Sequence, residues 1–170
     1  VPVDASKIGP SDYGALDRGL VESLGLRPED LIFAAAIVVD GVSFAVTGVS
    51  MGNPHAVAFV DEPIADIDLG RLGPLMEQHE AYPNRMNFHI VNIEDRDRLI
   101  SRTWERGSGL TLACGTGASA MVVAARLHGT GDSEVNVEVP GGELHITWPV
   151  YGAVLMDGDA VEVFNGDIPI

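Results

Sequence analysis

The only cysteine of the chain lies where a glycine-rich segment gives way to an apolar one. Cys114 is followed by Gly-Thr-Gly and then by small apolar residues as far as Ala125, and residues 107–125 carry no charge. This pattern predicts a helix that begins near Cys114. A helix N-terminus presents unpaired N–H groups and the positive end of a dipole. Such a position favours a thiolate, which lowers the thiol pKa, and it also favours a bound carboxylate or phosphate.

Three further polar clusters are expected at strand ends, where a scaffold presents side chains to a cleft. They are Asn53-Pro54-His55, Asn84-Arg85-Met86-Asn87 and Glu105-Arg106. A side-chain amide can accept from an ammonium group and donate to a carboxylate, and an arginine can clamp a carboxylate through two hydrogen bonds. Together with the cysteine, these clusters predict a site for an α-amino acid with a thiol acting as acid or base.

Each of these residues also fits a purely structural role. A free cysteine is commonly an inert core residue. Asn53 suits a turn before a proline, and Asn87 suits the bridging of backbone groups. Glu105 and Arg106 suit a solvated ion pair, and His55 suits a hydrogen-bonded core position. The remaining histidines show no ligand spacing, so no metal site is predicted, and Gly-Thr-Gly is too short for a nucleotide-binding fingerprint.

Composition limits the class of protein further. The chain has 170 residues, of which 46% are hydrophobic, enough for one domain with a real core. Its net charge of −15 argues against nucleic acid and anionic membranes as partners. One cysteine excludes an internal disulfide framework and a cysteine-based zinc cluster, and it suits a reducing compartment. The first residues show no signal-peptide pattern. We therefore expect a cytoplasmic protein.

Apolar periodicity predicts an α+β fold, a mostly antiparallel sheet wrapped around one central buried helix. Asp40-Gly41 separates two apolar runs, 31–39 and 42–49, as in a type I′ hairpin. Further strands are expected at 56–60, 85–93, 97–105, 134–139, 143–148, 153–156 and 161–164. Helices are expected near 16–24 and 66–80, the second with a break at Gly73-Pro74. The central helix includes 118–125, which is apolar on every face but too short to span a membrane, and Gly129 would end it.

Three motifs together resemble one enzyme family. M-G-N-P-H-A-V at 51–57, N-R-M-N-F at 84–88 and W-E-R-G-S-G-L-T-L-A-C-G-T-G-A-S-A at 104–120 resemble the C-terminal half of diaminopimelate epimerases. P-G-G-E-L at 140–144 fits a late turn of that family. The resemblance covers nearly the whole chain in the right order, and the seventeen-residue block is its most specific part.

The resemblance implies an isomerase that interconverts LL- and meso-2,6-diaminopimelate without pyridoxal phosphate or metal, in lysine and peptidoglycan-precursor biosynthesis. In this family two cysteines flank the substrate Cα, one removing a proton and the other delivering one. Cys114 matches one of that pair, and His55 and Glu105 match positions that tune the cysteine pKa values. The substrate-binding positions it implies are Asn53, Asn87, Glu105, Arg106, Gly115 and Thr116.

The sequence departs from the family in one respect, because the partner cysteine belongs to the family's N-terminal half and no second cysteine is present here. We therefore expect residues 1–170 to form a single domain that supplies one wall of a two-domain site and does not racemise alone. Its expected partners are a small-molecule substrate and an N-terminal half, and a homodimer stays open. Two alternatives remain: a related isomerase of the same fold acting on another small acid, and a non-catalytic binding domain.

Overall fold

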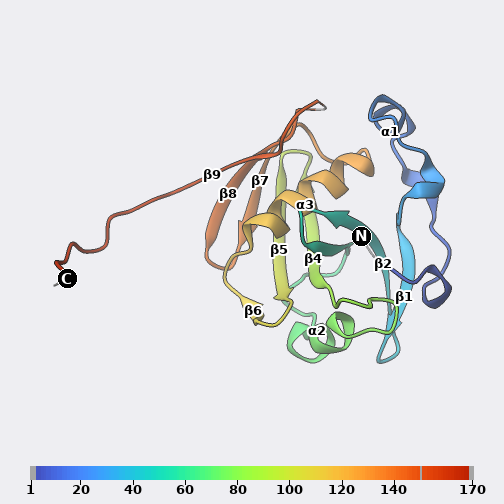
Figure 1. Cartoon of the computed structure of the whole chain (residues 1–170), viewed down its shortest axis with the longest axis horizontal. Coiled ribbons are helices and arrows are strands. Elements are labelled where there is room, and N and C mark those ends of the chain that lie inside the picture. Colours follow the sequence, from blue (N-terminus) through green and yellow to red (C-terminus); the bar gives the residue numbers. More distant parts are fainter. Residues whose placement is uncertain (1–2, 150, 169–170) are drawn as a thin grey trace.

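A computed structural model describes residues 3–149 and 151–168 and shows an α+β fold built on one mixed sheet (Figure 1). Its strands are β1 Ala35–Val39, β2 Val42–Ser50, β3 Pro54–Phe59, β4 Asn87–Asp95, β5 Arg98–Glu105, β6 Gly109–Thr111, β7 Glu134–Val139, β8 Gly142–Thr147 and β9 Leu155–Gly158. Its helices are α1 Arg18–Ser23, α2 Leu69–Glu77 and α3 Gly115–Leu127, with short 3₁₀ turns at Ala5–Lys7, Tyr13–Ala15 and Pro28–Asp30. None of the described helices is both long and apolar enough to cross a bilayer.

The sheet is not the simple antiparallel meander that the alternation predicts. Its strand order is β1-β2-β3-β4-β5-β7-β8-β9, with β6 paired to β5. Strands β3 and β4 run parallel, as do β5 and β7. Helix α2 connects the first of these pairs and helix α3 lies in the connection of the second. A crossover helix returns the chain to the same end of the sheet, so the next strand enters parallel to the last.

The two crossover helices cover opposite faces of the sheet. Side chains alternate between the faces along a strand. Along β3, Ala56 and Ala58 belong to the core cluster that contains α2, whereas Val57 between them belongs to the cluster that contains α3. Both clusters consist of buried hydrophobic residues, so the strands between them are buried on both sides. The polar strand ends next to α3 are thus held by a rigid scaffold.

Helix α3 is buried along most of its length. Nine of its thirteen residues are buried, and it packs against β2, β3, β4, β8 and β9. Small side chains such as Ala118, Ala120 and Ala124 let the helix approach the strands closely. The backbone after His128 enters the left-handed region at Gly129, with φ of 68°, as expected for a helix end. That the sheet wraps around this helix on every side stays a prediction.

Local signals predicted most of the elements. Asp40 and Gly41 have φ of 47° and 79°, the left-handed pair of a type I′ turn, and β1 pairs with β2 as a hairpin. Asp68 caps α2 by accepting from the N–H of Arg71. The expected break at Gly73-Pro74 is wrong, because α2 continues through Pro74.

Packing explains why α2 continues through this proline. A Cβ on Gly73 would come within 2.4 Å of the Trp104 ring, so this turn lies directly on the indole. Burial of that contact outweighs the backbone hydrogen bond that a proline cannot donate.

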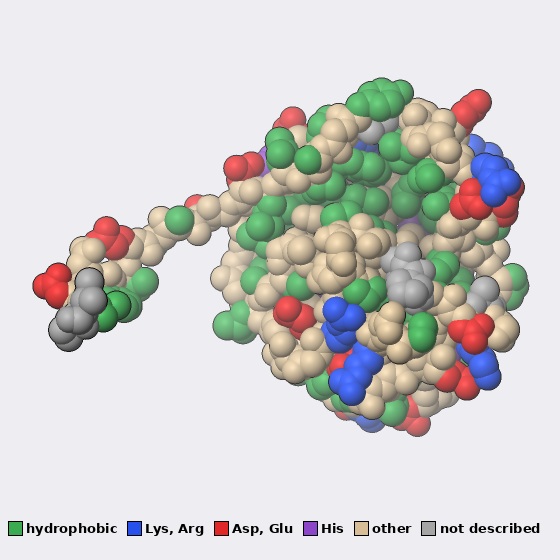
Figure 2. All heavy atoms as spheres, in the orientation of Figure 1, with side chains coloured by type: hydrophobic (Ala, Val, Ile, Leu, Met, Phe, Trp, Pro, Cys, Tyr) green, Lys and Arg blue, Asp and Glu red, His purple; other side chains and the backbone are tan. Residues whose placement is uncertain are grey.

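The C-terminal prediction is partly wrong. A strand does form, but at Leu155–Gly158, where it pairs with β8. No strand forms at 161–164, although Val161 and Val163 alternate with polar residues as an edge strand would. These two side chains are 81% and 89% exposed, and the tail that carries them stands away from the body of the molecule (Figures 1 and 2). Alternation predicts a strand only where a neighbouring strand is available for pairing.

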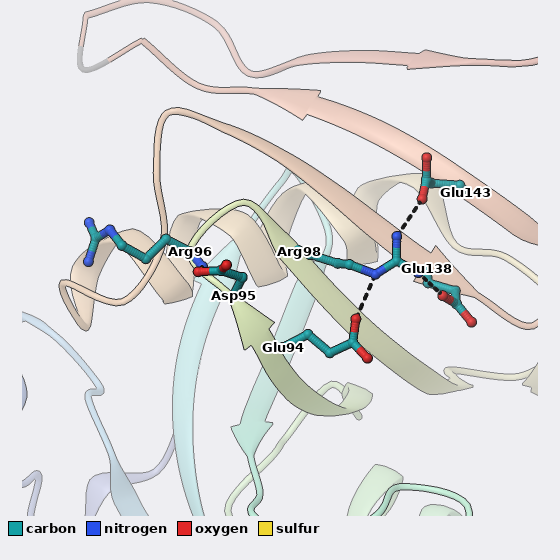
Figure 3. A network of polar contacts seen from close by, with 6 residues as sticks. All are labelled: Glu94, Asp95, Arg96, Arg98, Glu138 and Glu143. Carbon is teal, nitrogen blue, oxygen red and sulfur yellow. Dashed lines mark hydrogen bonds and ion pairs between the residues drawn. The ribbon is translucent and has the colours of Figure 1, made fainter.

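One arginine joins four neighbouring strands on the exposed side of the sheet (Figure 3). The guanidinium of Arg98 on β5 contacts Glu94 on β4 at 2.7 Å, Glu138 on β7 at 2.5 Å and Glu143 on β8 at 3.2 Å. These side chains are between 41% and 50% exposed, so water screens the pairs and their contribution to stability is small. The cluster is one part of the acidic surface.

Candidate active site

Cys114 is the N-cap of helix α3, the position that the sequence predicts for it. Its backbone is extended, with φ of −137° and ψ of 100°, and its carbonyl accepts from the N–H of Ala118. The sulfur lies 3.8 Å from the hydroxyl oxygen of Thr116. The residue is 7% exposed, so the thiol is covered in this chain but is not embedded among hydrocarbon alone.

The pKa of the Cys114 thiol is raised, contrary to the expectation from the helix start. Burial raises this pKa most, the backbone N–H of Gly117 and the hydroxyl of Thr116 lower it, and the charge of Glu105 raises it further. Desolvation therefore outweighs the helix N-terminus, because a thiolate in a covered site loses its hydration. The cysteine is held as a neutral thiol around pH 7.

Asn53 connects the start of β3 to the start of α3. Its amide nitrogen donates to the hydroxyl oxygen of Thr116 at 3.3 Å, and its amide oxygen lies 3.0 Å from Nε2 of His55. Gly52, with φ of 91°, makes the turn that brings Asn53 to this position. The structure therefore brings together Cys114, Thr116, Asn53 and His55, which lie as much as 63 residues apart in the chain.

His55 continues inward to a second histidine that the sequence reasoning did not select. Nδ1 of His55 lies 2.8 Å from Nε2 of His89 on β4, and Nδ1 of His89 lies 2.9 Å from the hydroxyl of Thr103 on β5. Both rings are fully buried, at 0% exposure. Burial and the charge of Arg106 lower the pKa of His55 to about 4. Burial and the neighbouring His55 lower the pKa of His89 well below its usual range, so both rings are neutral.

Asn87 connects the segment that carries Asn53 to the segment that carries Arg106. The buried amide of Asn87 donates to the carbonyl of Pro54 at 2.7 Å and accepts from the backbone N–H of Arg106 at 2.9 Å. The Arg106 guanidinium donates to the carbonyl of Asn84 at 2.9 Å and is exposed. Asn87 thus fixes backbone groups around the site, and its contact with substrate stays a prediction.

A cavity of about 490 Å³ opens beside these residues. It is lined by Ser50, Gly52, Asn53, Pro54, Asn84 and Arg106. A second cavity of about 490 Å³ lies at the far end of α3 and is lined by Asp17, Arg96 and Arg126 among others, but by none of the predicted site residues. The first cavity is therefore the candidate site, with an amide and a guanidinium on its wall. Cys114 does not line it and is connected to it through Thr116 and Asn53.

Three other predicted residues lie around the helix start. Gly115 and Thr116 are the first residues of α3, so their N–H groups have no carbonyl one turn earlier in the helix. A Cβ on Gly115 would come within 2.9 Å of the Met156 sulfur, which places β9 over this turn. Glu105 is half-buried at the end of β5, where its charge acts on the Cys114 thiol.

A buried carboxylate that the sequence reasoning missed holds the turn that carries Arg106. Glu77 on α2 is 5% exposed. It accepts from the indole N–H of Trp104 at 2.7 Å and from the N–H of Gly107 at 3.1 Å, and it contacts Arg85 at 3.4 Å. From sequence it resembles an acid on the surface of a helix, and only the packing of α2 on β5 shows otherwise.

No cluster of three or more His, Cys, Asp or Glu side chains that could bind a metal occurs within residues 3–149 and 151–168. The groups that the structure brings together here are a thiol, two amides, a guanidinium and the N–H groups of a helix start. These groups lie together at the start of α3, and comparison with known proteins shows to which family the chain belongs.

The family model for diaminopimelate epimerase matches residues 47–163, and the chain belongs to this family. Diaminopimelate epimerase from Leptospira biflexa is 44% identical over 144 residues, which are 85% of this chain and 51% of the relative. The enzyme of the same name from a Cyanothece strain is 50% identical over 143 residues, 83% of this chain and 51% of the relative. The chain spans about half the length of the curated relatives it matches.

Solved structures show a weaker likeness. A phenazine biosynthesis protein of the PhzF family from Bacillus anthracis is 19% identical, with a TM-score of 0.43, and the match covers 61% of this chain and 34% of that one. A protein of the same family from Enterococcus faecalis is 16% identical, with a TM-score of 0.43, covering 62% and 39%.

Proposed function

We propose that this chain forms one half of the active site of a diaminopimelate epimerase, which interconverts LL- and meso-2,6-diaminopimelate by proton transfer at Cα without pyridoxal phosphate. Cys114 is one of two acid/base groups, and a cysteine of an N-terminal half is the other. The proposal is supported by membership of the family and by one arrangement in the structure. That arrangement is the cysteine at the start of α3, joined through Thr116 to Asn53 on the wall of the cavity.

The raised pKa of Cys114 assigns it a role in this scheme. A neutral thiol delivers a proton, so the opposing cysteine would be the thiolate that removes the Cα proton. Cys114 gives its own proton to the opposite face of Cα and becomes the thiolate, and the reverse reaction exchanges the two roles. The charge that develops on the substrate carboxylate would be stabilised by the free N–H groups of Gly115 and Thr116 and by Arg106.

Exposed apolar residues around the helix start support the proposal that a second half of the enzyme covers this face. Leu110 and Leu112, which precede Cys114, are 52% and 71% exposed, and Met156 beside Gly115 is 51% exposed. Figure 2 shows apolar side chains gathered on the face that carries α3. An apolar surface of this kind marks an interaction site in a protein that is otherwise strongly charged. We propose that an N-terminal half covers this surface and closes the cavity.

Three finer expectations belong to the same proposal. With the N-terminal half in place, α3 would be the central buried helix of its domain, which the burial of nine of its thirteen residues supports. Dimerisation would leave the cavity free only if it used another face. A cytoplasmic location is supported by the single free cysteine, Cys114.

Deuterium exchange at the substrate Cα tests the proposal. The purified chain is incubated with LL-diaminopimelate in D₂O, alone and with the N-terminal half of a relative such as that from Leptospira biflexa. We expect no sustained exchange from the chain alone, and exchange with formation of the meso isomer once the second half is added. Cys114→Ala should abolish this exchange.

Other results would identify the alternatives. Exchange into another small acid, with none into diaminopimelate, would favour a related isomerase. Sustained exchange by the chain alone would overturn the prediction that a second half is needed. Binding of diaminopimelate without any exchange, even with both halves present, would favour a non-catalytic binding domain.

A further inference from the structure

The pair formed by His89 and Thr103 is a buried polar contact near the site, and the proposed reaction gives it no role. His89 is 0% and Thr103 is 4% exposed. The two residues are directly opposite each other on β4 and β5. Burying a polar side chain costs free energy unless its hydrogen bonds are made, and both ring nitrogens of His89 have partners. The pair is therefore a built feature rather than a chance contact.

These contacts form a continuous chain that ends at the cysteine. From Thr103 it runs through His89, His55 and Asn53 to Thr116, with separations of 2.9, 2.8, 3.0 and 3.3 Å. Thr116 then lies 3.8 Å from the sulfur of Cys114. Three of the links join different segments of the fold, so the hydrogen-bond chain connects the middle of the sheet to the start of α3.

The hydrogen bonds of this chain can all be donated in only one of two directions, toward Cys114 or away from it. A neutral imidazole has one nitrogen that donates and one that accepts, so fixing one contact of each ring fixes the other. In the direction that agrees with the orientation of the Asn53 amide, the Thr103 hydroxyl donates to Nδ1 of His89, and Nε2–H of His89 donates to Nδ1 of His55. Nε2–H of His55 then donates to the amide oxygen of Asn53, whose nitrogen faces Thr116.

The direction of these hydrogen bonds determines whether the Thr116 hydroxyl can donate to the sulfur of Cys114. In the direction that agrees with the Asn53 amide, Thr116 accepts from Asn53, so its own hydroxyl proton is free to point at Cys114. In the opposite direction the amide oxygen of Asn53 would face Thr116 and take that proton, and the sulfur would face only lone pairs. A hydroxyl donor stabilises a thiolate, since hydrogen bonds to charged acceptors are the stronger ones.

The buried Thr103 hydroxyl pairs its proton by donating to His89, which favours one direction of the hydrogen-bond chain. We infer that His89 and Thr103 are positioning residues, which hold the hydrogen-bond chain in this direction and thereby turn the Thr116 hydroxyl toward Cys114. The close packing of Gly117 supports the assignment: a Cβ there would come within 2.5 Å of His89 Cε1 and 3.1 Å of the Cys114 sulfur. The inferred role of His89 and Thr103 in orienting Thr116 is independent of the proposed function, and only its consequence for catalysis rests on that function.

Charged groups around this hydrogen-bond chain change the pKa values of its members and do not set its direction. Glu105 faces the thiol and raises its pKa, and Arg106 faces His55 and lowers its pKa. His89 faces His55 as a neutral ring. Neither histidine changes charge around neutral pH, so the inferred effect comes from orientation rather than protonation.

The first measurement needs no variant. Nitrogen NMR shifts of the histidine-labelled chain report which ring nitrogen carries the proton, and we expect both His55 and His89 to be protonated at Nε2. Protonation of His89 at Nδ1 would overturn the inference. The result does not depend on whether the protein is an epimerase, because no diaminopimelate is present.

The second measurement follows alkylation of Cys114 by iodoacetamide against pH. Thr103→Val keeps the shape and removes the hydroxyl, so we expect the apparent thiol pKa to rise by about half a unit and alkylation below that pKa to slow about threefold. Thr103→Ser, which keeps the hydroxyl, should restore the wild-type profile. An unchanged profile in folded Thr103→Val would overturn the inference.

A matched control is available at the opposite end of α3. Thr47 is 1% exposed and its hydroxyl lies 2.8 Å from Nε2 of His128, so Thr47→Val removes the same kind of contact. We expect it to leave the alkylation profile of Cys114 unchanged. An equal shift in Thr47→Val would show that the effect is a general loss of packing, and it would equally overturn the inference.

Discussion

The amide of Asn53 donates to the hydroxyl of Thr116 across 3.3 Å, and this contact ties the turn before β3 to the first turn of α3. Asn53 also lines the cavity, whereas Thr116 lies against the cysteine. A ligand that contacts Asn53 is therefore coupled to Cys114 through a single hydroxyl group. Recognition and proton transfer share this contact in the proposed reaction.

Replacement of Asn53 should separate these two roles. In the enzyme assembled from both halves we expect Asn53→Ala to lower kcat/KM by about 10²-fold, because it removes a polar contact in the cavity together with the support of Thr116. Asn53→Asp keeps an acceptor for His55 but loses the donor to Thr116, so its kcat should fall more than its KM rises. Steady-state kinetics measures both, and a wild-type kcat for both variants would contradict the coupling.

Glu77 should contribute to stability through the turn that carries Arg106. Glu77→Ala leaves the half-buried indole N–H of Trp104 and the N–H of Gly107 without this acceptor, so we expect a loss of about 1–3 kcal/mol in the free energy of unfolding. Glu77→Gln keeps one acceptor and should lose less. Urea unfolding measures the difference. Glu80→Ala, at an exposed ion pair with Lys7, is the control and should change stability by less than about 0.5 kcal/mol.

The sequence predicted the parts of the site that depend on local pattern. The helix start at Cys114 follows from glycines and an uncharged apolar run, and the hairpin at Asp40 follows from its turn chemistry. The mixed sheet was not predictable in the same way, because a parallel neighbour such as β4 beside β3 depends on where the α2 crossover returns the chain.

The remaining site residues could not be predicted because their contacts depend on the pairing and packing of segments that are far apart in the sequence. His89 faces Thr103 only because β4 and β5 pair with this offset, and Glu77 is buried only because α2 packs on Trp104. The prediction of a lowered pKa for Cys114 was wrong for the same reason. A helix start can be predicted from sequence, but the side chains that cover it cannot. What a sequence shows is the type of group; what surrounds that group depends on the fold.

Gly117 should not tolerate a methyl group, although alanine is the better helix former. Its Cβ would lie 2.5 Å from His89 and 3.1 Å from the sulfur of Cys114, so we expect Gly117→Ala to cost about 1–3 kcal/mol of stability and to alter the alkylation rate of Cys114. Gly70→Ala on α2 is the matched control. Its Cβ would meet nothing closer than 3.5 Å, so it should stabilise the chain by up to about 1 kcal/mol. Equal effects of the two changes in thermal unfolding would contradict the tight packing.

Acid should destabilise the chain through its buried histidines. Burial lowers the pKa of His55 to about 4, from 6.5 in the unfolded chain, so between these values the unfolded state binds more protons than the folded one. Stability is therefore complete above about pH 6.5 and falls as the pH drops toward 4, by about 3 kcal/mol for this one ring.

Unfolding in urea at a series of pH values measures this loss, and His55→Gln should remove about one proton from its pH dependence. His128 is the matched case, since burial lowers its pKa to about 4 as well, at the other end of α3. His128→Gln should reduce the pH dependence of stability by a similar amount while leaving the alkylation of Cys114 unchanged. A pH dependence that is the same in wild type and in His55→Gln would mean that His55 is not buried as a neutral ring.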